Sequence, residues 1–178
     1  MVGRCVVGLA LLGLLGAGCA PAAKREPPLE ESISSQSTVP PALKANLSTI
    51  LREGTELELV SLHQGFLKCA TGLEHFREFW QLDSTKVTDE KVREELVSAL
   101  ERAATDPTIA SKCFEPRHAI RVNHEGATYD LAISFECEKV RAYKGKDLIS
   151  EFLVGNRHQP PFDKVLTEAR VKVAEKPK

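Results

Sequence analysis

The strongest constraint on the fold is a strict two-residue alternation in the second half of the chain. From Tyr129 to Cys137, apolar side chains at odd positions alternate with mostly polar ones at even positions. A strand with this pattern buries one face and exposes the other. Ile120 to Asn123 alternates in the same way, and Glu125-Gly126 between the two segments is typical of a turn. We therefore expect an antiparallel hairpin with one buried face.

Three helices are predicted around this hairpin. The first begins near Pro41 and ends near Gly54, with an apolar stripe at Leu43, Leu47, Ile50 and Leu51. The second is capped by Thr88, is followed by Asp106-Pro107, and has its apolar face at Val92, Leu96, Ala99, Leu100 and Ala103. Its other face, with Arg93, Glu94, Glu101 and Arg102, is interpreted as solvated. The third follows Pro160-Pro161, with apolar positions Phe162, Val165, Leu166 and Ala169.

Further strands are expected at residues 57–62, 76–82 and 140–143, the last followed by a turn at Lys144-Gly145-Lys146. In the second of these strands, Phe76, Trp80 and Leu82 are expected on one face, with Trp80 in the core. The order of elements predicts an α+β fold: a mostly antiparallel sheet of four to five strands with two to three helices packed on it. We expect one domain over residues 41–173 and a frayed tail at 174–178.

The first eighteen residues have the pattern of a secretory signal. Arg4 lies close to the start, and a nearly unbroken apolar run extends from Cys5 to Leu15. The run is too short for a transmembrane helix, which needs about 20 apolar residues. A positive start, a short apolar core and the small residues 16–18 are typical of an exported chain.

The segment Leu15-Gly16-Ala17-Gly18-Cys19 resembles the lipobox of bacterial lipoproteins, with Gly16 where leucine is usual. The resemblance implies cleavage before Cys19, a diacylglycerol on its sulfur, and acylation of the new amino group by a chain such as palmitate. Several acyl chains give a permanent anchor, because each buried CH₂ contributes about 0.8 kcal/mol. Residues 19–40, poor in large apolar side chains, would then form a disordered tether. The alternatives are an ordinary signal peptide with a chance cysteine, or a retained membrane-spanning anchor.

Five cysteines reduce to three if Cys5 leaves with the signal and Cys19 carries lipid. Cysteines of an exported chain are disulfide candidates. We favour Cys113–Cys137, because both residues lie in or beside strand-like segments, and Cys69 then remains as a partly buried thiol. A zinc site of Cys113, Cys137, His118 and His124 is the alternative, although the spacing matches no compact zinc pattern.

Two segments of the folded part, Cys113-Phe114-Glu115-Pro116-Arg117-His118 and Phe135-Glu136-Cys137, resemble segments of small uncharacterised exported bacterial proteins. This resemblance supports the Cys113–Cys137 pairing and implies no activity.

The sequence contains no nucleophile elbow, zinc-protease helix motif, phosphate-binding or dinucleotide-binding glycine loop, or Cys-x-x-Cys motif. Its densest polar cluster is Glu115, Arg117 and His118, joined by His124. One interpretation makes His118 a general base and Arg117 a binding group for an anion. We favour a structural interpretation, in which Arg117 pairs with a carboxylate where a strand begins.

Three functions are compatible with these features, and none requires a metal or a cofactor. The favoured one is a non-catalytic module in the cell envelope, outside the cytoplasm and attached to a membrane through the lipid on Cys19, that binds a protein or a cell-wall component. The second is a small-ligand binder with a pocket between sheet and helices. The third is an enzyme using His118, Glu115 or Asp130, which requires these side chains to converge. A net charge of −1 excludes the strongly basic character typical of nucleic-acid binding.

Overall fold

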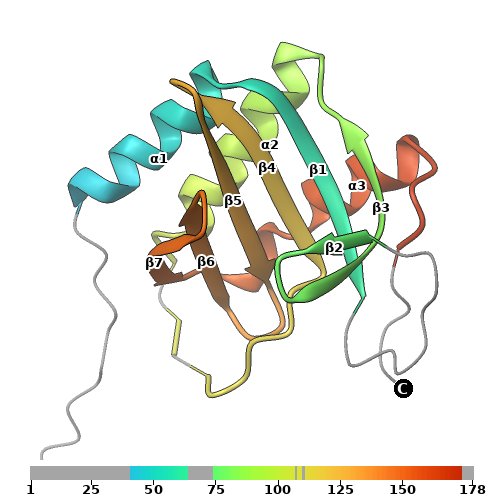
Figure 1. Ribbon diagram of the computed structural model, residues 1–178. Helices are drawn as coiled ribbons and strands as arrows, with labels where there is room; N and C mark the ends of the chain where they lie inside the picture. The colour runs from blue at the N-terminus through green and yellow to red at the C-terminus, as the bar shows by residue number, and fades with distance from the viewer. Residues whose placement is uncertain (1–40, 64–73, 107, 110, 174–178) are drawn as a thin grey trace, which may run out of the picture. The chain divides into compact units, whose positions relative to one another are not determined.

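The computed structural model describes residues 41–63, 74–106, 108–109 and 111–173 (Figure 1). They form three α-helices, a short 3₁₀ helix and seven strands. The helices are α1 (Pro41–Glu53), α2 (Glu90–Ala103) and α3 (Pro160–Glu168), and the 3₁₀ helix is η1 (Asn156–His158). The strands are β1 (Thr55–His63), β2 (Glu74–Phe76), β3 (Phe79–Lys86), β4 (His118–His124), β5 (Ala127–Ser134), β6 (Lys139–Lys144) and β7 (Asp147–Leu153).

The strands form one antiparallel sheet in the order β2-β3-β1-β4-β5-β6-β7. The β4–β5 hairpin is confirmed. Its two turn residues, Glu125 and Gly126, have φ values of 49° and 74°, the combination that matches the twist of a two-residue hairpin. The α+β class is also confirmed, but the sheet has seven strands rather than four to five. The sequence prediction missed β7 because Leu148, Ile149 and Phe152 do not alternate cleanly, and the register shifts between β6 and β7.

All three helices lie on one side of the sheet (Figure 1). The main core lies between the helices and the sheet. The central strands contribute alternate residues to it, such as Ile120 and Leu131, which are both completely buried. Phe162 and Leu166 of α3 belong to the same core. Ala169, predicted to share this apolar face, is instead exposed at the end of α3.

Two polar contacts join α1 to α2. The guanidinium of Arg52 donates to the carboxylates of Glu94 and Glu101 at distances of 2.6 to 2.9 Å, and the bond from Arg52 lowers the pKa of Glu94 to about 2. Arg93 donates to the backbone carbonyls of Arg52 and Gly54, which lack partners at a helix end. The charged face predicted to be solvated is therefore in part the seam between two helices.

The other side of the sheet is partly covered by the β2–β3 hairpin, which curls across it (Figure 1). Four strand positions separate β2 from β5 in the sheet order, a distance of roughly 19 Å in a flat sheet. Arg77, at the tip of the hairpin, nevertheless lies 2.8 Å from Asp130 on β5. The sheet therefore curls strongly, and Phe76 packs with Val60, Leu62, Ala119, Ala132 and Tyr143 in a second, smaller core.

Two local predictions were wrong. The cap of α2 is Asp89, whose carboxylate accepts from the amides of Lys91 and Val92, rather than Thr88. The strand predicted over residues 76–82 is split by the turn at Arg77 and Glu78, so Trp80 pairs with His75 rather than lying on the face of Phe76. Trp80 is half-buried and stacks on the His75 ring, with 3.9 Å between ring centroids.

The Cys113–Cys137 disulfide is confirmed, with Cα atoms 5.6 Å apart. Strand β5 ends at Ser134 rather than continuing to Cys137, which lies in the turn before β6. The bond therefore joins the irregular segment before β4 to the turn between β5 and β6. Several predictions concern residues outside the described ranges. They are the signal sequence, the lipid on Cys19, the tether, the thiol of Cys69 and the frayed tail at 174–178. No helix among the described residues is long and apolar enough to cross a membrane.

Candidate functional site

The polar cluster predicted from the sequence is not brought together. His118 lies on the helix-covered side of the sheet, is 1% exposed, and its Nε2 lies 2.8 Å from Asp163 Oδ1 on α3. The rings of Phe135 and Phe162 contact its imidazole edge to face. Burial disfavours the charged carboxylate of Asp163, but the contact with His118, the hydrogen bond from Gln159 and the charge of Arg117 outweigh it and lower the pKa of Asp163. This pair fastens α3 to β4.

The other members of the cluster point elsewhere. Glu115 is exposed, and its backbone rather than its carboxylate bonds to the hydroxyl of Ser134. Arg117 is buried and donates to Glu136 over 3.2 Å, as the structural interpretation predicted. His124 lies at the opposite end of β4 from His118, with its ring against Tyr129. These groups have no common cleft in which they could act together.

The zinc alternative fails because Cys113 and Cys137 are joined in a disulfide and cannot act as thiolate ligands. Within residues 41–63, 74–106, 108–109 and 111–173, no three His, Cys, Asp or Glu side chains are grouped to hold a metal ion. Asp130, the third residue named for an enzyme, lies on the side of the sheet away from His118. Its carboxylate is bound by two arginines instead.

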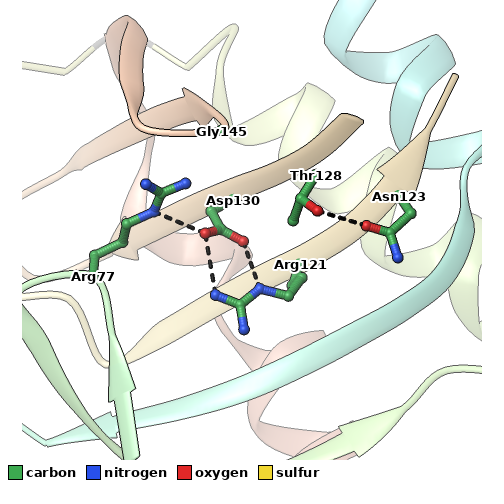
Figure 2. A pocket seen from close by; sticks show the side chains of 6 residues that line it. All are labelled: Arg77, Arg121, Asn123, Thr128, Asp130 and Gly145. Atoms are coloured by element: carbon green, nitrogen blue, oxygen red, sulfur yellow. Dashed lines mark hydrogen bonds and ion pairs between the residues drawn. The ribbon is translucent and has the colours of Figure 1, made fainter. Parts of the chain in front are cut away.

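These two arginines define the candidate site (Figure 2). Arg121 on β4 donates from Nε and Nη2 to the two oxygens of Asp130 on β5, at 2.8 and 3.2 Å. Arg77 approaches from the β2–β3 turn, with its Nε 2.8 Å from Asp130 Oδ2 but not directed along a hydrogen bond. The Asp130 side chain is 3% exposed, whereas those of Arg77 and Arg121 are 16% and 35% exposed. One buried carboxylate thus holds two guanidinium groups at the surface.

The guanidinium groups line an open depression of about 530 Å³. Its other lining residues are Asp130, Asn123, Thr128 and Gly145 (Figure 2). The Thr128 hydroxyl donates to Asn123 Oδ1, and Asn123 donates in turn to Glu56, so these side chains are held in place. The bond to Asp130 raises the pKa of Arg121, although partial burial opposes the change. We call this depression the Arg77–Arg121 site.

The surroundings of the site are rich in arginine and aromatic side chains. Three guanidinium groups lie over aromatic rings on this side of the sheet, 4.0 to 4.7 Å from the ring centroids. The pairs are Arg77 over Tyr143, Arg121 over Phe76, and Arg141 over Phe114. We call the surface formed by these six residues the arginine face.

A second cavity, of about 240 Å³, lies between α1, α2 and the sheet. Its walls are mainly apolar and include Leu47, Leu51, Leu100, Leu131 and Phe152, with the polar residues Ser48, Glu101 and Thr105 among its lining. Its volume is slightly below the range of about 300 to 1,000 Å³ typical of small-ligand pockets.

Sequence reasoning could have found half of the Arg77–Arg121 site. Once the β4–β5 turn is placed at Glu125-Gly126, counting outward pairs Arg121 with Asp130, as the register confirms. Arg77 carries no such signal, because the curl of the sheet rather than strand pairing brings it to Asp130.

The fold and site define an α+β domain with a curled seven-stranded antiparallel sheet, a helical layer on one face, and an open depression with polar lining residues on the other. The sequence matches no known family model or curated protein, and the fold matches no solved structure. The function is therefore argued from the site.

Proposed function

We propose that this chain is a lipid-anchored protein of the cell envelope whose folded domain binds a protein or a cell-wall component without catalysing a reaction. The observation that carries the binding role is the arginine face, with three guanidinium groups stacked on aromatic rings beside an open depression. The anchoring part rests on the lipobox-like segment that ends at Cys19.

The composition of the arginine face favours binding. Arginine and aromatic residues are enriched among those that dominate the energy of protein interfaces. Stacking also orients each guanidinium before a ligand arrives, so less side-chain freedom is lost on binding. The opposite face of the sheet is closed by three helices and cannot offer its central residues to a partner.

Catalysis has less support than binding. The three residues named for an enzyme do not converge, since Glu115 is exposed, His118 is buried against α3, and Asp130 is neutralised by two arginines. Two guanidinium groups contact the buried Asp130 carboxylate, so its oxygens are not presented to a substrate.

The binding role is tested by photo-crosslinking in intact cells. A photoreactive amino acid is placed at Glu78 or Asn123 on or beside the arginine face, and at Glu95 of α2 or Lys164 of α3 as matched controls. Glu78, Glu95 and Lys164 are all exposed. We expect cross-linked products from the first pair alone. Equal cross-linking from both pairs, or from the helical pair alone, would contradict a role for the arginine face.

The anchor is tested with Cys19→Ala. The unaltered chain should fractionate with membranes and incorporate labelled palmitate, and the variant should incorporate none. Incorporation at an equal level would exclude Cys19 as the attachment point.

The apolar cavity between α1, α2 and the sheet favours a second candidate function, the binding of a small apolar ligand. Mass spectrometry of the native protein extracted from membranes would detect such a ligand. Val97→Phe, which places a large side chain in the lining of the cavity, should abolish its retention.

A further inference from the structure

We infer that the Arg77–Arg121 site binds one carboxylate group of the domain's ligand, an inference that rests on the proposed binding role. A guanidinium carries five N–H donors. Asp130 accepts from Nε and Nη2 of Arg121 and lies beside Nε of Arg77. The remaining N–H groups of both side chains have no hydrogen-bond acceptor among the residues that the structure describes. The site therefore has a surplus of charged donors at an open surface.

The geometry favours a planar acceptor. Arg77 is stacked on Tyr143 and Arg121 on Phe76, with 4.6 and 4.7 Å between guanidinium carbon and ring centroid. Stacking and the shared contact with Asp130 hold the planar, forked guanidinium groups of both arginines in fixed orientations. A planar carboxylate can then accept two parallel N–H bonds, an arrangement that adds both energy and directional specificity.

The charges of the lining residues favour an anion with a single charge. The lining has two positive charges and the one negative charge of Asp130, which leaves an excess of one positive charge. Glu58 and Glu74 also act electrostatically on Arg121, and Glu58 accepts a hydrogen bond from Ser84. They would repel a doubly charged phosphate more strongly than a singly charged carboxylate.

A purely structural role explains less of this arrangement. An ion pair between Arg77 and Asp130 is sufficient to hold the β2–β3 hairpin against β5. Arg77 moreover occupies a turn position with φ of 60°, where glycine or asparagine would be less strained. Arginine at this position supplies a second guanidinium at the depression, which a structural clasp does not need.

The test is a titration of the mature lipidated chain, labelled with ¹⁵N and purified in detergent, observed through its arginine Nε–H resonances. Arg77→Lys and Arg121→Lys each remove one resonance and so assign it. The probes are a tripeptide with a free C-terminus, glucuronic acid, and inorganic phosphate. The C-terminally amidated peptide and the glucuronate methyl ester are the matched neutral controls.

We expect a free carboxylate to shift both resonances with a Kd of about 1 mM, the affinity of a weak single-group contact. The neutral controls should leave both unchanged, and phosphate should bind at least tenfold more weakly. Preference for the peptide identifies a peptide-borne carboxylate, and preference for glucuronate identifies a sugar acid. Either preference supports the inference.

Arg77→Gly removes the guanidinium and fits the positive φ of the turn, so it should weaken carboxylate binding at least tenfold while the domain stays folded. Arg77→Lys keeps the charge but not the fork and should weaken binding to a similar extent. Arg102→Lys, at an exposed position of α2 on the other side of the sheet, is the control and should bind normally. The thermal unfolding midpoint of each variant verifies folding.

No carboxylate-dependent shift, or phosphate binding as tight as carboxylate binding, would overturn this inference. The proposed function is judged separately by cross-linking. If cross-links at Glu78 and Asn123 persist while carboxylates do not bind, the binding role stands and the carboxylate assignment fails. If those cross-links are also missing, both fail.

Discussion

The two faces of the sheet are built by the same strands but differ in chemistry. The helix-covered face presents Ile120, Leu131 and other large apolar side chains that are completely buried. On the other side, Arg121 of the arginine face and Asp130 of the Arg77–Arg121 site lie on the same two strands, one residue away from those apolar positions. Neighbouring residues of a strand point to opposite sides, so one pair of strands supplies both surfaces.

This difference assigns most of the stability to one face and, in our proposal, the binding role to the other. Burial of apolar surface contributes most of the free energy that favours folding, and the helix-covered face supplies most of it here. The arginine face keeps polar groups that an apolar core would exclude, because it is covered only in part by the β2–β3 hairpin. Substitutions should therefore have different consequences on the two faces.

The largest expected effect is that of Leu131→Ala. Leu131 is completely buried on the helix-covered face, and its truncation should lower the free energy of unfolding by about 3 to 5 kcal/mol, because it removes apolar contacts and leaves a cavity. Thr128→Ala, on the other face of the same strand, is the matched control and should lose about 1 kcal/mol with the bond to Asn123. Urea denaturation measures both. Equal losses would mean that the two faces do not differ in this way.

The disulfide is expected to have the next largest effect. Cys113 and Cys137 are 24 residues apart, and closing a loop of that length stabilises a fold by about 3 kcal/mol. The double variant Cys113→Ser/Cys137→Ser should therefore unfold at correspondingly lower urea concentration. A reducing agent should reproduce the loss in the unaltered chain and have no effect on the double variant. An unchanged midpoint after reduction would contradict the prediction.

Gly54→Ala should disturb the packing between α1 and the sheet. A Cβ at this position would lie 2.6 Å from the Ile50 carbonyl oxygen and would collide with the Val122 side chain. We expect a loss of about 2 kcal/mol, typical of overpacking, measured by thermal unfolding. Cross-linking from the arginine face should be retained below the unfolding temperature. Loss of those cross-links in a folded variant would indicate that the two faces are coupled.

The smallest expected effect is that of Asp163→Asn, which alters the polar contact between α3 and β4. Because the Asp163 side chain is 45% exposed, we expect a loss of about 0.5 to 1 kcal/mol at neutral pH. The folded-state pKa of Asp163 is lowered, so its contribution is complete above the unfolded value of about 4 and is lost as the pH falls through the folded value. The difference between the two proteins should shrink below about pH 4. A difference that grows on acidification would contradict this assignment.

Much of the fold follows from local patterns. The alternation around Tyr129 and the Glu125-Gly126 turn predicted the β4–β5 hairpin, and helical periodicity predicted α1, α2 and α3. Strand pairing in a hairpin is set by its turn, so the Arg121–Asp130 pair could also have been predicted from the sequence. The Cys113–Cys137 disulfide was also predicted, from the strand-like segments around the two cysteines.

Other features depend on contacts between distant parts of the chain. The irregular alternation of β7 concealed a strand, because a register shift moves its side chains between faces. The charges of Glu94 and Glu101 indicated a solvated face, although Arg52 binds both across the α1–α2 seam. His118 and His124 belong to one strand, but its length keeps them apart, and α3 covers His118.

The sequence by itself therefore determined the α+β class, the central hairpin, the helices and the disulfide, because period, turn chemistry and cysteine position are local properties of the chain. The tertiary structure alone decided the number of strands, the curl of the sheet and the meeting of Arg77 with Asp130. That meeting joins a hairpin tip to a strand 53 residues later by numbering, and it depends on how far the sheet bends. Bending is a collective property of all seven strands and their packing, so no local pattern encodes it.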